Sequence, residues 1–312
     1  MTNKIQGIHH ITAIAGSAQR NHDFYTKVLG LRMVKRTVNF DDPGTYHFYY
    51  GNESGTPGTI LTFFPWEGIV GGRTGTGMAT EIGYSVPKDS LEFWVNRFKE
   101  MNVKQGGIAE RLGEVYLPFQ DPDGLKLELI AGKYGDDRQP WIEGGVPGEA
   151  AAKGFHSVTL TLRSIGPTAT ILTDVFGYEL KEQEGKRYRF VTSSVPTANI
   201  IDLVEAPDEA RGHQGGGTNH HVAFRVPNED VQMEFREKLL KMGTNITPKI
   251  NRDYFYSLYF REPGGVLFEI ATDNPGFTVD EPLNELGKNL KLPVQYESRR
   301  GDIEKGLPKL KV

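Results

Sequence analysis

Two pairs of adjacent histidines, His9-His10 and His220-His221, each begin a segment with the composition of a β-strand. The two segments read G-I-H-H-I-T-A-I and T-N-H-H-V-A-F-R-V, and a third strand-like segment, G-V-L-F-E-I, carries Glu269. Two imidazoles and one carboxylate are the ligand set of mononuclear Fe(II) oxygenases. These residue types could therefore support oxygen chemistry at one metal ion, provided that the fold brings the three segments together.

The overall composition limits the classes of protein to consider. The 312 residues, 38% of them hydrophobic, suffice for two globular domains. The net charge of -4 and the scattered basic residues argue against a nucleic-acid partner. Because no apolar run could span a membrane and the N-terminus lacks a signal-peptide core, we expect a cytoplasmic protein without membrane contact. The absence of cysteine leaves only nitrogen and oxygen ligands for a metal.

The chain repeats one structural pattern four times. A strand begins near Gly7, Ala79, Gly154 and Asn219, and each strand is followed by an amphipathic stretch typical of a helix and then by further strand-like sequence. In the second unit the last two strands flank the turn D-P-D-G, and in the fourth they flank E-P-G-G. Each of the four units is therefore predicted to be βαβββ.

Four βαβββ units over about residues 5–272 resemble the vicinal oxygen chelate superfamily, which includes glyoxalases, antibiotic-resistance proteins and extradiol dioxygenases. The resemblance implies an α+β fold with two domains of paired units, in which curved mixed sheets surround a metal site. The segment rich in Gly, Pro and charge after residue 135 is similar to a linker. The expected divisions are an N-terminal domain at 1–135, a linker at 136–153, a C-terminal domain at 154–272 and a tail at 273–312.

Metal ligands in this superfamily come from the first and last strands of a unit, and only units one and four have histidine in the first strand. The first-strand residues of the four units are His10, Glu81, Ser157 and His221, and the last-strand residues are Thr62, Glu128, Asp202 and Glu269. No two consecutive units supply two histidines and a carboxylate. We therefore predict that unit one pairs with unit four, so that His10, His221 and Glu269 bind one ion. Units two and three would then form a degenerate site without imidazole.

The motifs H-H-I-T, H-H-V-A-F and F-E-I are similar to those of hydroquinone ring-cleaving dioxygenases. This resemblance implies Fe(II), O2 and a hydroquinone-type or catechol-type aromatic diol, in aromatic degradation or detoxification. It also implies catalytic roles for residues that match positions near the ligands, namely His9, Thr12, His220, Arg252 and Tyr259. His220 is the candidate for proton transfer, because a histidine with a near-neutral pKa can accept and return a proton. Strict alternation along a strand, however, would point His220 away from His221.

Other interpretations remain open at this stage. A glyoxalase-like isomerase or a thiol transferase would use the same scaffold with Ni, Zn or Mn, commonly with a second carboxylate ligand. A metal-free drug-binding resistance protein would not need the three proposed ligands. The oligomeric state is open, a homo-oligomer included. The remaining histidines, which have no repeat-matched partner, are predicted to be structural: His22, His47, His156 and His213. The glycine-rich stretch 68–77 lacks the G-K-[ST] ending of a phosphate loop and is predicted to be a flexible connection.

Overall fold

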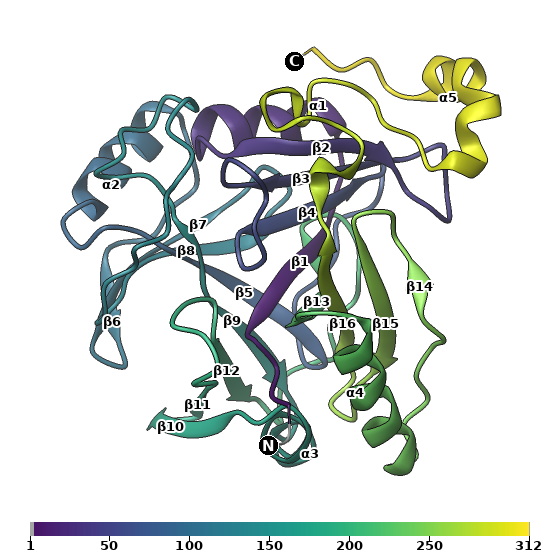
Figure 1. Ribbon diagram of the computed structural model, residues 1–312. Coiled ribbons are helices and arrows are strands. Elements are labelled where there is room, and N and C mark those ends of the chain that lie inside the picture. Colours follow the sequence, from purple (N-terminus) through teal and green to yellow (C-terminus); the bar gives the residue numbers. More distant parts are fainter. Residues whose placement is uncertain (1–2, 312) are drawn as a thin grey trace.

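A computed structural model describes residues 3–311 of the chain, and within this range each of the four units has the predicted βαβββ order (Figure 1). The elements of unit one are β1 (Ile8–Ala15), α1 (Ala18–Asp23), β2 (Arg32–Val38), β3 (Tyr46–Gly51) and β4 (Ile60–Pro65). Those of unit two are β5 (Met78–Ser85), α2 (Leu91–Glu100), β6 (Ala109–Arg111), β7 (Glu114–Gln120) and β8 (Lys126–Ala131).

Units three and four repeat this order. The elements of unit three are β9 (Gly154–Leu162), α3 (Gly166–Thr170), β10 (Glu179–Glu184), β11 (Arg187–Val191) and β12 (Ile200–Glu205). Those of unit four are β13 (Thr218–Val226), α4 (Glu229–Lys241), β14 (Ile250–Asn251), β15 (Phe255–Arg261) and β16 (Leu267–Pro275). In units one and three the helix continues as a π-helical turn, at Phe24–Val28 and Ile171–Val175. The tail ends in α5 (Arg300–Gly306).

Each sheet combines one unit from the N-terminal half of the chain with one unit from the C-terminal half. Units one and four form an eight-stranded sheet with the order β14-β15-β16-β13-β1-β4-β3-β2, and units two and three form a second with the order β10-β11-β12-β9-β5-β8-β7-β6. The units join through antiparallel pairing of β1 with β13 and of β5 with β9. Within each unit the first strand lies parallel to the last, so both sheets are mixed and the α+β class is confirmed. The predicted pairing of unit one with unit four is also confirmed.

The strands are explained by the alternation of apolar and polar residues in the sequence, because this alternation places the apolar side chains on one face of the strand. In β13, Val222 and Phe224 are fully buried in the main hydrophobic core, where Phe224 packs against Phe268 of β16 with ring centroids 4.7 Å apart. The opposite face of the same strands carries His221 and Glu269. Because one face of the sheet is committed to this apolar core, the register that presents the polar side chains on the other face is fixed.

The glycine-rich stretch 68–77 is an ordered part of the fold, contrary to the expectation of a flexible connection. It pairs with the equivalent connection of the other half, residues 210–217, through Gly72 N donating to Gly216 O at 2.9 Å and Thr76 N donating to Ala210 O at 3.0 Å. A Cβ atom at Gly75 would lie 2.3 Å from Ala210 O. Glycine is therefore required for this close approach of two backbones, and it does not serve flexibility.

The tail lies across unit one, over β2 and α1 in Figure 1. Its main polar anchor is Lys35 of β2, whose side chain is fully buried and whose Nζ donates to Asp280 at 2.6 Å and to Glu281 at 2.5 Å. Tyr296 donates from its hydroxyl to Phe40 O at 2.7 Å, so the tail also holds the segment after β2. Among the residues described, no helix is both long and apolar enough to span a bilayer.

Replacing Lys35 by Met should lower the free energy of unfolding by about 3–5 kcal/mol, because removal of one partner leaves the buried carboxylate of Glu281 without a counter-ion. Urea unfolding followed by circular dichroism measures this change. The control is Lys288→Met, which breaks an exposed ion pair with Glu285 and should change the free energy of unfolding by less than about 1 kcal/mol. Equal effects of the two substitutions would contradict the anchoring role of Lys35.

Candidate metal centre and active site

Two β-bulges between β1 and β13 determine how the histidine pairs are presented. The register passes from Ile8↔Phe224 to His10↔Ala223 and from Thr12↔His221 to Ala13↔Asn219. His9 and His220 are therefore the extra residues of the two bulges, which release each strand from strict alternation. This explains how His220 and His221 can both line one cavity, although their adjacent positions in a regular strand would point them to opposite faces.

The proposed ligands meet on three strands of the first sheet. Nε2 of His10 lies 3.1 Å from Oε2 of Glu269, Nε2 of His221 lies 2.9 Å from the same oxygen, and the two nitrogens are 3.4 Å apart. All three side chains are buried, and among residues 3–311 they are the only group of three or more His, Asp or Glu whose ligand atoms lie within 4.8 Å of one another. The strand pairing thus brings together residues from both ends of the chain.

The donor set and its spacing fit a divalent metal ion. An octahedral ion with bonds of about 2.1 Å holds adjacent donors about 3 Å apart, which matches the three separations. Oε2 of the fully buried Glu269 lies close to both imidazoles yet receives no hydrogen bond of good geometry within the described residues, whereas Oε1 accepts one from Ser257 at 2.5 Å. A buried carboxylate oxygen in this situation calls for a cation. The residues present therefore fit the metal that the resemblance implies.

The ionisation of the three groups suits metal binding. Burial alone would raise the pKa of Glu269, but the adjacent His10 and His221 imidazoles hold it well below its usual value, so the carboxylate is charged. Burial lowers the pKa of His221 despite the opposing effect of Glu269, so its imidazole is neutral. A charged carboxylate and a neutral imidazole are the forms in which these side chains coordinate a metal.

The first histidine of each pair orients the second. Nδ1 of His9 lies 2.9 Å from Nδ1 of His10, and Nδ1 of His220 lies 2.8 Å from Nδ1 of His221. A histidine that offers its Nε2 lone pair to a metal carries its proton on Nδ1, so with a metal bound His10 and His221 would donate to their neighbours. His9 and His220 are then left with their own protons on Nε2.

A cavity of about 230 Å³ opens beside the three proposed ligands. Four of the five predicted catalytic residues, Thr12, His220, Arg252 and Tyr259, line it. His9 does not line it and packs instead behind His10 against Phe255, with ring centroids 5.2 Å apart. The remaining cavity lining is largely aromatic and comes mainly from unit one: Asn39, Phe40, Asp41, His47, Tyr49, Phe64, Trp66, Phe255 and Leu267.

The electrostatics of the cavity differ in one respect from expectation. Burial lowers the pKa of His220 to about 3, so this imidazole is neutral at physiological pH, without the near-neutral pKa assumed from its residue type. Arg252 pairs with Asp41 at 3.3 Å and lies 5.5 Å from the ring of Tyr259. Burial also raises the pKa of the Tyr259 phenol, which keeps its proton.

His47, predicted to be structural, is part of a buried hydrogen-bond chain that ends at the metal centre. Its Nδ1 lies 2.9 Å from the Tyr49 hydroxyl and its Nε2 lies 2.9 Å from Oγ1 of Thr62. Thr62 contacts Oγ1 of Thr12 at 2.8 Å, which in turn lies 2.9 Å from Nε2 of His221. The comparison of repeats missed His47 because it considered only first and last strands. Alternation in Y-H-F-Y-Y, which places His47 and Tyr49 on one face, was the available signal.

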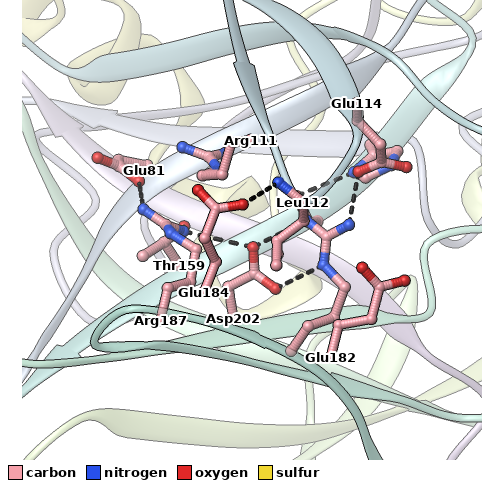
Figure 2. A network of polar contacts seen from close by, with 12 residues as sticks. Glu81, Arg111, Leu112, Glu114, Thr159, Glu182, Glu184, Arg187 and Asp202 are labelled. Carbon is pink, nitrogen blue, oxygen red and sulfur yellow. Dashed lines mark hydrogen bonds and ion pairs between the residues drawn. The ribbon is translucent and has the colours of Figure 1, made fainter.

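The second sheet contains the equivalent positions, and arginines fill the space between them (Figure 2). In all four units the last-strand residue pairs with the residue two places after the first-strand position, as Thr12↔Thr62, Gly83↔Glu128, Thr159↔Asp202 and Ala223↔Glu269. The two superfamily ligand positions thus correspond across the repeats. Arg187 donates to Glu81 at 2.9 Å, Arg111 to Glu128 at 2.6 Å, and Arg189 to Asp202 at 2.9 Å.

His156 occupies the position in unit three that corresponds to the first histidine of each pair. It is the bulge residue of β9, because the register passes from Gly83↔Ser157 to Tyr84↔Phe155. Its Nδ1 lies 3.1 Å from Oγ of Ser157, as the first histidine of each pair contacts the second. In unit three, therefore, the orienting histidine is present but serine stands at the ligand position.

Comparison with known proteins agrees with this fold. A family model described as the Glyoxalase/Bleomycin resistance protein/Dioxygenase superfamily matches residues 7–129 and 154–270. The chain belongs to this superfamily. It is 47% identical to "Putative ring-cleaving dioxygenase MhqO" of Bacillus subtilis, over 98% of this chain and 97% of that protein. It is 35% identical to "Chlorohydroquinone/hydroquinone 1,2-dioxygenase" of Sphingobium indicum, over 96% of this chain and 95% of that protein.

A solved structure covers almost the whole chain. The crystal structure of a "putative dioxygenase" from Bacillus subtilis superposes with a TM-score of 0.95 at 46% sequence identity, over 99% of both chains. The chain is thus an enzyme, and its full-length relatives place it among the ring-cleaving dioxygenases of the superfamily.

Replacement of His10, His221 or Glu269 by Ala should abolish retention of the metal, because each substitution removes one of three ligands from a buried site. Glu128→Ala is the matched control: Glu128 occupies the position in unit two that corresponds to Glu269, but Arg111 neutralises it. The measurement is the metal content of purified protein after anaerobic loading and desalting. Metal at the wild-type level in His10→Ala would contradict a site shared between units one and four.

Proposed function

We propose that the chain is an Fe(II)-dependent dioxygenase that uses O2 to open the ring of a hydroquinone-type or catechol-type diol, in cytoplasmic degradation or detoxification of aromatic compounds. The observation that carries this proposal is the convergence of two imidazole nitrogens and one carboxylate oxygen beside a small aromatic cavity that both histidines line. The full-length similarity to a protein named as a hydroquinone dioxygenase supports it. Fe(II) would supply binding of the phenolate and of O2 side by side, and transfer of electron density between them.

The cavity selects for one aromatic ring. Its volume of about 230 Å³ lies below the roughly 300–1,000 Å³ of sites for drug-sized ligands. Phe64, Trp66 and Phe255 provide flat apolar surface for a ring and displace water from around it. Exclusion of water strengthens the effect of every charge in the cavity on the bound diol.

Polar residues at the cavity wall anchor the substrate oxygens. The para hydroxyls of a hydroquinone cannot both reach one ion, so the distal hydroxyl needs a protein partner. Tyr259 keeps its proton and can donate a hydrogen bond, while the Arg252 guanidinium stabilises negative charge that develops on oxygen. These two residues come from β15 and the segment before it, in the same sheet as the proposed ligands.

His220 supplies a hydrogen-bond donor of defined tautomer. Because Nδ1 of His220 accepts from His221, its proton lies on Nε2. Since burial lowers the pKa of His220 to about 3, it does not take up a second proton before the substrate enters. Its proposed function is therefore to donate a hydrogen bond from Nε2 to an oxygen of the bound substrate while keeping its own proton. His9, which is outside the cavity, only orients His10.

The chain from Tyr49 through His47 and Thr62 fixes the direction of the Thr12 hydroxyl. Each hydroxyl in it can donate one hydrogen bond and accept another, and neutral His47 donates at one nitrogen and accepts at the other. The orientation of one member therefore sets all the others. When the lone pair of His221 is engaged by a metal, the Thr12 hydroxyl is free to meet a substrate oxygen.

The structure favours this function over the two alternatives. A glyoxalase-like isomerase or thiol transferase commonly needs a second carboxylate, yet the position in unit one that corresponds to Glu269 is Thr62, already bonded to Thr12 and His47. A metal-free drug-binding protein would gain nothing from burying Glu269 completely between two imidazoles.

One anaerobic experiment separates the three functions. Protein loaded with Fe(II) is mixed with methylhydroquinone, catechol or the methylglyoxal–glutathione adduct, O2 is admitted, and its uptake is followed with an electrode. We expect stoichiometric O2 consumption with an aromatic diol and none with the thiol adduct. Absence of uptake with every diol, in protein shown to contain Fe(II), would refute the proposed dioxygenase.

His47→Leu should lower kcat by about tenfold while metal content stays at the wild-type level, because loss of one ordering hydrogen bond of about 1–1.5 kcal/mol releases the Thr12 hydroxyl. Steady-state O2 uptake and metal analysis together test this. The control is His22→Leu, which replaces another buried histidine that lies outside the cavity lining. An unchanged kcat in His47→Leu, or an equal loss in His22→Leu, would show that His47 is only structural.

A further inference from the structure

A second cavity, of about 440 Å³, adjoins the active-site cavity at His220. The two cavities share His220, His221 and Leu267 in their walls. The second cavity has a different chemical character, because no acidic residue lines it and Arg211 and Arg261 both do. A small aromatic cavity therefore adjoins a larger cationic one, with a catalytic candidate between them.

The two arginines converge on one turn. Nη1 of Arg261 donates to Gly265 O at 2.7 Å, and a Cβ atom at Gly265 would lie 3.8 Å from Nη2 of Arg211. Gly265 has φ +101°, a conformation that L side chains rarely adopt, and it packs against Gly77 of the paired connections. Both arginines are exposed, and neither forms an ion pair with any carboxylate of residues 3–311. Two like charges held together without a counter-ion favour the binding of an anion.

A neutral hydrogen-bonding group completes the cavity. Asn219 is buried at its wall, and its Nδ2 donates to Ala79 O at 3.1 Å. This contact fixes the orientation of the amide, and its Oδ1 has no donor among the described residues. Because Oδ1 of Asn219 is itself buried, the groups of the cavity that suit an anion are the two exposed guanidinium groups.

The proposed reaction makes a molecule of this chemistry. Ring opening breaks one carbon–carbon bond of a neutral diol and adds both atoms of O2. One oxygen completes a carboxylic acid at the carbon that carried the hydroxyl, and the other makes an aldehyde at its neighbour. The two carbons supply the electrons that reduce O2, and the acid releases its proton at neutral pH. The product is thus an anion that keeps the second hydroxyl as an enol.

We propose that the cavity formed by Arg211, Arg261 and Asn219 binds the carboxylate of the ring-opened product as it leaves the active site. This proposal rests on the proposed dioxygenase function. The charge of the cavity separates product from substrate, because a neutral diol gains little from the guanidinium groups whereas a carboxylate forms charge-assisted hydrogen bonds with them. The product would then be drawn away from the metal centre and would not compete there with new substrate.

The test uses cis,cis-muconate, an open-chain dicarboxylate, as a stable analogue of the product. Its binding to the iron-loaded protein under anaerobic conditions is measured by calorimetry for wild type, Arg211→Gln, Arg261→Gln and the double variant. Each substitution should weaken binding about tenfold, as expected for loss of one charge-assisted hydrogen bond, with unchanged binding of methylhydroquinone. Arg163→Gln, which neutralises an exposed arginine outside the cavity lining, is the control and should leave muconate binding unchanged.

The outcomes distinguish this proposal from the proposed function. Muconate affinity that is equal in wild type and the double variant overturns the product site, whether or not the protein consumes O2 with diols. An equal loss of affinity in Arg163→Gln also overturns it, because the effect would then reflect net charge alone. Arginine-dependent binding of muconate in a protein that consumes no O2 with any diol overturns the dioxygenase function and, with it, the identity of the anion as a product.

Discussion

Antiparallel pairing of β1 with β13 is the interaction on which the rest of the structure depends. It joins unit one to unit four, places His10 and His221 with their Nε2 atoms 3.4 Å apart, and sets Glu269 of the adjacent β16 against both. The pairing is held by an apolar core on one face of the sheet, so a shift of one residue would exchange core and ligand positions. Two bulges in the same pairing then allow both histidines of a pair to act at one centre, one as proposed ligand and one as its support.

The same repeated unit forms a candidate metal site in the first sheet and a site filled by arginine side chains in the second. At the corresponding strand positions the first sheet has one carboxylate, Glu269, and the second has three, Glu81, Glu128 and Asp202. The second sheet lacks imidazoles there and satisfies its carboxylates with Arg111 and Arg187 (Figure 2) and with Arg189. Guanidinium groups supply permanent positive charge and hydrogen bonds, so the buried carboxylates need no ion. In the first sheet Lys35 and Arg252 pair with other acids, and Oε2 of Glu269 remains without a hydrogen-bond donor within the described residues.

Much of this arrangement could be predicted from the sequence, because repeats and alternation are local patterns. These patterns were sufficient to predict the βαβββ units, the α+β class, the pairing of unit one with unit four and the correspondence of Thr62 with Glu269. His220 lies on the cavity wall because of a bulge. A bulge depends on pairing between distant strands and leaves no local signal in the sequence. The cavity contacts of Phe40 and Trp66 lie outside the repeated strands, and the low pKa of His220 depends on burial, which the residue type does not show. The role of His47 was missed because only the first and last strands of the units were compared, and the bulge position of His156 depends on the pairing of β9 with β5.

We propose that one iron ion is held by side chains from units one and four. The most direct measurement is anomalous X-ray diffraction, recorded on either side of the iron absorption edge, from crystals grown and loaded with Fe(II) without oxygen. We expect one iron peak per chain, bounded by Nε2 of His10, Nε2 of His221 and Oε2 of Glu269. A peak among Glu81, Glu128 and Asp202 of the second sheet, or no peak beside Glu269 in crystals shown by fluorescence to contain iron, would contradict it.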